Sequence, residues 1–159
     1  MNYTVRRMRA DEAGALKHFL YLAIFVPEGE MPPPESILDK PELRVYIDGF
    51  GRQKGDTALL AEAEGHAIGA VWARVMDDYG HVDDDTPSLA ISVEAAYRGQ
   101  GVGTALMRAM LECLRRAGWR RVSLSVQKQN RAVGLYRAVG FQTLRETPEE
   151  YIMVCPLDA

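Results

Sequence analysis

Three glycines spaced two residues apart follow an arginine in residues 98–104, Arg-Gly-Gln-Gly-Val-Gly-Thr, between a predicted strand and a predicted helix. Glycine allows the backbone to approach a ligand closely and to adopt a positive φ angle. The free N–H groups at the start of a helix, together with the helix dipole, attract anions, and Arg98 adds a positive charge. We therefore expect this turn to bind a pyrophosphate; the alternative is a tight turn that binds no ligand.

The glycine spacing argues against two common phosphate-binding loops. The dinucleotide fingerprint is G-x-G-x-x-G, with an acidic residue roughly 20 positions further on. This chain has G-x-G-x-G instead, and the corresponding later segment, residues 122–126, is apolar and hydroxylated. The nucleoside triphosphate loop requires G-K-[ST], which the sequence does not contain. The expected pyrophosphate therefore belongs to another class of molecule.

A second group of residues that could carry chemistry begins at Asn130. This asparagine can cap a helix that contains Val133, Tyr136 and Val139, and Gly140 can end that helix. A tyrosine hydroxyl, with an unperturbed pKa of about 10, can donate a proton as a general acid. The structural alternatives are a simple helix cap for Asn130 and a core aromatic for Tyr136.

Hydrophobic periodicity predicts the elements that must position these motifs. The clearest is a helix over residues 102–117, with apolar residues at i, i+3, i+4 and i+7. Another helix is expected after Asp11, its N-cap, and one or two short ones over residues 35–50. Strands are expected at residues 3–9, 57–63, 66–75, 88–93, 121–126, 141–145 and 151–155. This order predicts one α/β domain, residues 1–159, with a mixed central sheet of about seven strands and helices on both faces.

Composition narrows the class of protein. Apolar residues make up 47% of the chain and charged residues 26%, with a net charge of −3, which argues against nucleic acid or an anionic membrane as a partner. Two cysteines are too few for a disulfide framework and lack metal-ligand spacing. We find no apolar stretch typical of a signal peptide or a membrane span, so we expect a cytoplasmic protein without a bound metal.

Together the two motifs resemble the GNAT superfamily of N-acetyltransferases. Residues 98–103 match its nucleotide motif [RQ]-x-x-G-x-[GA]. Residues 130–141 match its second motif, an asparagine-capped helix followed by L-Y-x-x-x-G-F. The resemblance covers residues 88–141, and the part before it agrees only in the order of its elements. It implies a fold in which two central parallel strands, residues 88–93 and 121–126, splay apart to open a cleft for acetyl-CoA.

The resemblance also implies roles for individual residues. Backbone groups of Ile91, Ser92 and Val93 would pair with the pantetheine arm as an added strand would. The pyrophosphate would be held by Arg98, Gly99, Gln100, Gly101, Val102, Gly103 and Thr104. Asn130 would contact the pantetheine, and Tyr136 would protonate the leaving thiolate. The implied reaction transfers an acetyl group from acetyl-CoA, as co-substrate, to a primary amine by direct attack in a ternary complex.

The chain departs from the family pattern in two respects. The asparagine that many members carry seven residues before the tyrosine is Gln129 here, so either Gln129 or Asn130 could face the cofactor. Many members also carry a glutamate on one of the splayed strands, where this chain has only serines as polar residues. Candidate bases elsewhere are Glu62, Glu64, His81 and Asp83–Asp85, and we assign none. The five aspartates within residues 76–87 could instead attract a cationic amine.

Two other functions and the oligomeric state stay open at this point. A non-catalytic acyl-CoA sensor would keep the cofactor site without turnover, although Tyr136 argues against it. A protein or peptide amine could replace a small-molecule amine as acceptor, depending on whether the proline-rich loop, residues 28–34, closes the site. A homodimer is the commonest oligomer in general.

Overall fold

The structure is a computed structural model that describes residues 2–157, and it contains one seven-stranded mixed sheet. The strands are β1 (Thr4–Arg7), β2 (Thr57–Ala63), β3 (His66–Arg74), β4 (Ser88–Val93), β5 (Arg121–Gln127), β6 (Gln142–Glu146) and β7 (Glu150–Pro156). Their order in the sheet is β1-β2-β3-β4-β5-β7-β6. β4 and β5 pair in parallel, and every other neighbouring pair is antiparallel. The predicted fold class is therefore confirmed.

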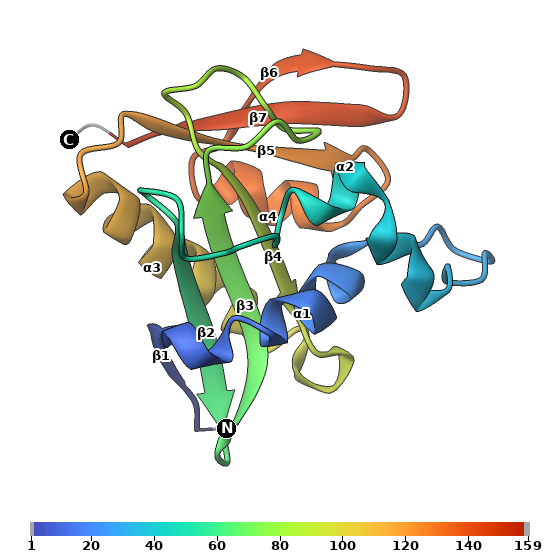
Figure 1. Ribbon diagram of the computed structural model, residues 1–159. Helices are drawn as coiled ribbons and strands as arrows, with labels where there is room; N and C mark the ends of the chain where they lie inside the picture. The colour runs from blue at the N-terminus through green and yellow to red at the C-terminus, as the bar shows by residue number, and fades with distance from the viewer. Residues whose placement is uncertain (1, 158–159) are drawn as a thin grey trace.

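Helices cover both faces of this sheet (Figure 1). The α-helices are α1 (Ala15–Ala23), α2 (Pro41–Arg44), α3 (Val102–Arg116) and α4 (Ala132–Ala138), and the short 3₁₀ helices are η1 (Ala10–Glu12), η2 (Glu35–Asp39) and η3 (Ala95–Tyr97). One apolar core joins the sheet to α3 and α4. A second core joins the opposite face to α1 and the η2–α2 segment. None of the helices in residues 2–157 is both long and apolar enough to cross a membrane.

The prediction that Asp11 caps the first helix is wrong. Asp11 lies inside η1, and α1 begins only at Ala15. The capping contact comes from Glu12, whose carboxylate accepts a hydrogen bond of 2.8 Å from the Arg9 N–H. The same carboxylate also pairs with Arg6 at 2.7 Å, so this turn is fastened to β1 through a charge-assisted bond.

β4 and β5 meet at one end and then part. Their single register pair within residues 2–157 is Ser88 with Ser123. At that point the Ser123 N–H donates to the Pro87 carbonyl over 2.9 Å, and the Ser123 hydroxyl donates to the Gly80 carbonyl over 2.7 Å. Beyond this junction β5 and β7 run across the view at a steep angle to β2, β3 and β4 (Figure 1). The predicted splay is confirmed, and the two strands open toward their C-terminal ends.

A buried ion pair fastens the segment after α2 onto the sheet. Arg74, on β3, pairs with Asp56 at 3.0 Å, and both side chains are 1% exposed. The Arg74 guanidinium also donates to the carbonyls of Val45 and Asp48 over 3.1 and 2.8 Å. These bonds fix the chain on either side of Tyr46.

Candidate active site

Two adjoining pockets occupy the gap where β4 and β5 diverge. The larger has a volume of about 1250 Å³ and the smaller about 360 Å³. Both are lined by Ile91 on β4, by Asn130 and Tyr136, and by residues 23–25 at the end of α1. The gap is thus divided into a long groove and a compact cavity that meet at Tyr136.

The glycine-rich turn forms one end of the larger pocket. Gly99 and Gly101 have φ angles of 74° and 86°, a left-handed conformation that glycine adopts without steric cost. Within the described part of the chain, no group accepts a hydrogen bond from the amides of residues 99–104. α3, 15 residues long, starts at Val102, so its dipole and these free N–H groups favour an anion here.

Most of the expected cofactor residues line this larger pocket, and two do not. Those that do are Ile91, Ser92, Val93, Arg98, Gly99, Gly101, Gly103, Thr104 and Asn130. The Val102 side chain is 1% exposed in the core beneath α3. The Gln100 amide is turned away to donate to the Ala96 carbonyl over 3.2 Å. These two residues can therefore contribute only their backbone N–H groups.

The open edge of β4 presents free backbone groups to the gap. Pro87 directs its carbonyl to Ser123 of β5, and every second residue along a strand points its backbone groups to the same side. The backbone groups of Leu89, Ile91 and Val93 therefore point toward β5, whereas those of Ser92 point toward β3, so the backbone pairing expected of Ser92 is wrong. Leu89 adjoins the Ser88–Ser123 pair, where β4 and β5 are still bonded, and the Val93 carbonyl accepts a bond of 2.9 Å from the Arg98 guanidinium. Ile91 is therefore the residue of this edge that faces the gap where β5 has moved away.

Asn130 acts on the helix that follows it. Its side-chain oxygen accepts a hydrogen bond of 2.9 Å from the Ala132 N–H, so the predicted capping contact is present, although Arg131 is the formal N-cap of α4. The amide nitrogen of Asn130 is left for the pockets. Asn130 lines both of them, whereas Gln129 lines only the larger.

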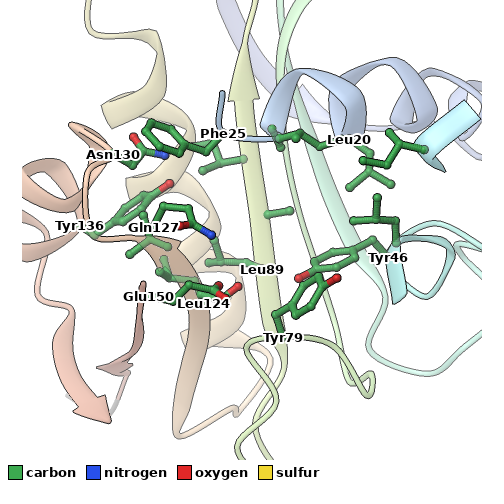
Figure 2. A pocket seen from close by; sticks show the side chains of 18 residues that line it. Leu20, Phe25, Tyr46, Tyr79, Leu89, Leu124, Gln127, Asn130, Tyr136 and Glu150 are labelled. Carbon is green, nitrogen blue, oxygen red and sulfur yellow. The ribbon is translucent and has the colours of Figure 1, made fainter. Parts of the chain in front are cut away.

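Tyr136 lies at the junction of the pockets, with its hydroxyl directed toward the gap (Figure 2). The side chain is 8% exposed, and burial raises the pKa of its hydroxyl to about 12. Its ring packs at 6.0 Å from that of Phe141, and its carbonyl accepts the Phe141 N–H over 2.9 Å. The turn at the end of α4 thus holds a protonated phenol at this position.

The smaller pocket has an apolar wall and a few hydroxyl, amide and carboxyl groups. Its apolar residues are Leu20, Ala23, Ile24, Phe25, Ile37, Leu43, Leu89, Ala90, Ile91, Leu124 and Val126. Its other residues are Tyr46, Tyr79, Ser125, Gln127, Asn130, Tyr136 and Glu150. Figure 2 shows Glu150, Gln127 and Tyr136 on one wall and Tyr46 and Tyr79 on the facing wall.

Glu150 is a carboxylate of the site that the sequence alone did not indicate. It begins β7 and stands opposite Gln127 of β5 in the sheet register. Residues opposite one another in register share a face of the sheet, and both line the smaller pocket. Burial, with a smaller contribution from the neighbouring Glu149, raises the pKa of the Glu150 carboxyl. Its only local signal was the alternation of β7, and its partner strand lies more than twenty positions earlier in the chain.

A buried carboxylate stands behind the tyrosine wall. Asp78 accepts a hydrogen bond of 2.7 Å from the Ser88 hydroxyl, and burial raises the pKa of its carboxyl. Burial first, and then the nearby Asp78, raise the pKa of Tyr46. For Tyr79 burial again acts first, followed by Glu42 and Glu150, and its pKa is also raised. Both phenols are therefore held protonated on this wall.

The base candidates considered from sequence lie elsewhere: none of Glu62, Glu64, His81 or Asp83–Asp85 lines either pocket. Glu62 pairs with Arg6 at 3.1 Å. Asp83 bonds to Arg121 at 2.6 Å, and hydrogen bonds from Thr86 and Arg121 lower the pKa of its carboxyl. Of the acidic loop, Asp78 alone stands directly behind the smaller pocket, so the expectation that Asp83–Asp85 attract an amine finds no support here.

Among residues 2–157, no group of three or more His, Cys, Asp or Glu side chains is arranged to hold a metal ion. The chemical groups gathered at the gap are instead an anion-binding turn, an open strand edge, a phenol and a carboxylate. The free amides of residues 99–104 fit the pyrophosphate of a coenzyme A, and the groove beside β4 fits its extended arm.

Solved structures share this fold over nearly the whole chain. The ribosomal-protein-S18-alanine N-acetyltransferase from Escherichia coli has a TM-score of 0.67 at 19% identity, covering 99% of this chain and 96% of that one. The yncA protein from Salmonella typhimurium, solved with its cofactor acetyl-CoA, has a TM-score of 0.73 at 19% identity, covering 100% of this chain and 96% of that one. At these identities the likeness concerns the fold.

Sequence relatives are similar over part of their length. Human N-acetyltransferase 8B is 34% identical over 89 residues, which are 55% of this chain and 39% of that protein. Mouse N-acetyltransferase family 8 member 3 is 33% identical over 94 residues, 58% of this chain and 42% of the relative. The matched part thus spans about two fifths of these relatives. The Acetyltransferase (GNAT) family matches residues 22–141, well over half of the chain, and this protein therefore belongs to that family.

Proposed function

We propose that this protein is an N-acetyltransferase that moves an acetyl group from acetyl-CoA to a primary amine by direct attack in a ternary complex. One observation carries the proposal: a groove with an anion-binding end and a compact cavity meet at the hydroxyl of Tyr136. A sensor of acyl-CoA would need the groove alone. The second cavity, with its carboxylate and phenols, supports an acceptor bound beside the acetyl donor.

The groove supports the binding of the donor through groups that this chain provides. The amides of residues 99–104 would hold the pyrophosphate, with Arg98 adding charge, and the open edge of β4 would pair with the pantetheine arm. The Asn130 amide nitrogen would contact that arm. When bound, acetyl-CoA supplies an acetyl thioester, in which a C–S bond is exchanged for a C–N bond to the amine. The Ile91 N–H, on the free edge, would polarise the acetyl carbonyl.

Glu150 and Tyr136 would move the protons of this exchange. A primary amine is protonated near neutral pH and must lose one proton before its lone pair can attack; Glu150 would take that proton and release it to solvent. As the C–N bond forms, the sulfur leaves with the electron pair of the C–S bond. Tyr136 would give its hydroxyl proton to the sulfur and regain one from the nitrogen. The products are an amide, a thiol and one proton in solvent.

Calorimetry with acetyl-CoA tests the donor half of the proposal. Gly101→Glu places a carboxylate where the pyrophosphate would bind, and we expect it to abolish binding. Gly101→Ala is the matched control: it carries the same positive φ angle of 86° without the charge, so any strain is common to both. Weaker binding of acetyl-CoA by Gly101→Glu alone supports the glycine-rich turn as the pyrophosphate site. Equal effects of the two variants, or no binding by the unaltered protein, would contradict it.

Release of free thiol in the presence of acetyl-CoA tests the acceptor half. A panel of primary amines, including small amines, amino acids and peptides with free N-termini, should contain at least one that accelerates thiol release. If acetyl-CoA binds but no amine in the panel accelerates release, transfer to an amine is wrong and the sensor alternative gains support.

A further inference from the structure

The two pockets differ in the charges that line them. Arg98 and Arg131 line the larger, with Glu28 as its acidic residue. Within the described residues, Glu150 is the one charged side chain that lines the smaller, and no lysine, arginine or histidine does so. Two more carboxylates, Glu42 and Asp78, lie close enough to act on the tyrosine wall of the smaller pocket. The smaller pocket therefore favours a cation and offers an anion no side chain of opposite charge.

The smaller pocket is also compact and largely apolar beyond its carboxylate. Its volume of about 360 Å³ lies near the lower limit of ligand sites and is roughly twice that of a cavity that holds benzene. Leu20 and the rings of Tyr46 and Tyr79 lie across the gap from Glu150 (Figure 2). Tyr79 is 49% exposed, so its ring forms a rim between the cavity and solvent.

Besides Glu150, the polar side chains that line the smaller pocket are uncharged hydroxyls and amides, from Tyr46, Tyr79, Ser125, Gln127, Asn130 and Tyr136. The side chains of Leu20, Ile37 and Leu43, which also line the pocket, offer no hydrogen bonds. A peptide placed there would leave its amide groups unpaired, and each such group costs free energy when it is removed from water.

On these grounds we infer that the smaller pocket selects a compact primary amine with an apolar body, a single positive charge and no carboxylate, such as an arylalkylamine. This inference rests on the proposed function, because it names the acceptor of the same reaction. The ammonium group would lie beside Glu150 and Tyr136, and the hydrocarbon body would lie against Leu20 and the tyrosine rings.

Binding to the protein saturated with CoA tests this selection without turnover. We would compare 2-phenylethylamine with phenylalanine, which adds a carboxylate to the same skeleton, with 1,5-diaminopentane, which has a second charge, and with a tripeptide that begins with phenylalanine. We expect 2-phenylethylamine to bind roughly tenfold more tightly or better than each of the others. Tighter binding of any other probe, equal binding of all four, or no binding of 2-phenylethylamine would overturn the inference.

A variant of the apolar wall tests its cause. Leu43, half-buried on α2, lines the smaller pocket and not the larger one, and Leu43→Arg would add a cation to its wall. We expect this variant to bind 2-phenylethylamine more weakly and phenylalanine more tightly, so that the ratio of their Kd values narrows roughly tenfold. The apolar control Leu43→Met should leave that ratio unchanged. The ranking of probes by the unaltered protein stands as a test even if Leu43→Arg fails to fold.

Failure of this inference differs from failure of the proposed function. If acetyl-CoA binds and a peptide or an amino acid is acetylated in preference to 2-phenylethylamine, the protein is an N-acetyltransferase and the substrate class is wrong. If acetyl-CoA does not bind, or no amine of any class releases thiol, the proposed function itself is wrong.

Discussion

At the scale of single residues, the proposed chemistry divides between a phenol and a carboxylate on the same wall of the gap. Tyr136 is buried at the end of a short helix, and its pKa is raised to about 12, so it holds a proton that it can donate. Glu150 lines only the smaller pocket, which we propose as the site of the acceptor amine and call the acceptor pocket. Burial raises the pKa of its carboxyl, which makes it a stronger base than an exposed glutamate. Tyr136 is therefore suited to donate a proton and Glu150 to accept one.

Removal of the Tyr136 hydroxyl should slow the reaction without loss of donor binding. Tyr136→Phe keeps the ring that packs against Phe141, so we expect kcat to fall roughly 10²- to 10⁴-fold, the usual contribution of a general acid. The Kd for acetyl-CoA should stay within about twofold, because the phenol makes no contact with the glycine-rich turn proposed to bind the pyrophosphate. Steady-state rates and calorimetry on the same preparation measure both. An unchanged kcat would remove Tyr136 from the mechanism.

The pH dependence of the rate should report Glu150. A carboxylate that acts as base must be deprotonated, so the rate should fall as pH drops through its pKa, which lies above the value of about 4.3 for an unperturbed glutamate. Glu149 and Tyr79 are the titratable groups coupled to it, and both tyrosines of the facing wall stay protonated across this range.

Glu150→Gln tests this assignment. It should lower kcat/KM and remove the fall in rate at low pH that is caused by protonation of the carboxyl. The remaining pH dependence of the rate should then reflect only the ionisation of the amine substrate. Glu149→Gln is the matched control, because Glu149 is exposed and lines neither pocket. It should keep the fall in rate and move it only slightly to lower pH, since the charge of Glu149 raises the pKa of Glu150. A Glu150→Gln profile that superimposes on that of the unaltered protein would mean that water or another group takes the proton.

At the scale of elements, the loop between β3 and β4 shapes the acceptor pocket by its close contact with β5. A Cβ atom added to Gly80 would lie 3.0 Å from the backbone carbon of Leu124 and 3.0 Å from the backbone nitrogen of Ser125. Because both are backbone atoms, the loop must move away, and Tyr79 is the adjacent residue. The wall of the pocket therefore depends on a glycine whose own conformation is unstrained.

We accordingly expect Gly80→Ala to raise the KM for the amine several-fold and to cost roughly 1–3 kcal/mol of stability, as overpacking does. The Kd for acetyl-CoA should not change, since Gly80 is remote from the glycine-rich turn. Gly134→Ala is the control: no atom lies within 4 Å of the added Cβ. Equal KM values for the two variants would show that the loop does not set the acceptor site.

The sequence allowed most elements to be predicted, and the exceptions have physical causes. β4 (Ser88–Val93) was predicted to the residue, because a short apolar run is bounded by Pro87 and by the turn at Glu94. The cap of the first helix was predicted wrongly, since several acidic residues there can cap and the choice of Glu12 depends on Arg6 from β1. The role of Glu150 could not be predicted, because the β5–β7 register that carries it into the pocket joins distant segments.

The glycine-rich turn could be predicted from local sequence, whereas the acceptor pocket could not. The groups proposed to bind the pyrophosphate are backbone amides within seven consecutive residues, so local sequence specifies almost all of them. The smaller pocket takes residues from the helices α1, η2, α2 and α4, from the strands β4, β5 and β7, and from the loops that hold Phe25, Tyr46, Tyr79 and Asn130. Residues such as Tyr46 and Tyr79 carry no local sign of that function, and only the assembled sheet brings them together.

At the scale of the whole molecule, two apolar cores on opposite faces stabilise the sheet, and a buried ion pair joins the α2 segment to one face. Asp56→Ala would leave the Arg74 guanidinium, 1% exposed, without its carboxylate. We expect a loss of roughly 3–5 kcal/mol in the free energy of unfolding, measured by urea denaturation.

An exposed ion pair in the same segment provides the control. Asp48 pairs with Arg44 at 3.2 Å, and both side chains are 56% exposed, so Asp48→Ala should cost at most about 1 kcal/mol. The carbonyl of Asp48 that Arg74 binds is kept in this variant. Similar losses in the two variants would contradict the anchoring role given to the Arg74–Asp56 pair.

The most direct test of the central claim is a grid of initial velocities. Thiol release would be measured while the concentrations of acetyl-CoA and of the best amine in the panel are varied together. Direct attack at the junction of two simultaneously filled pockets predicts that release depends on the amine and that the double-reciprocal lines intersect. Parallel lines, which indicate an acetylated enzyme intermediate, or release that is independent of the amine would contradict it.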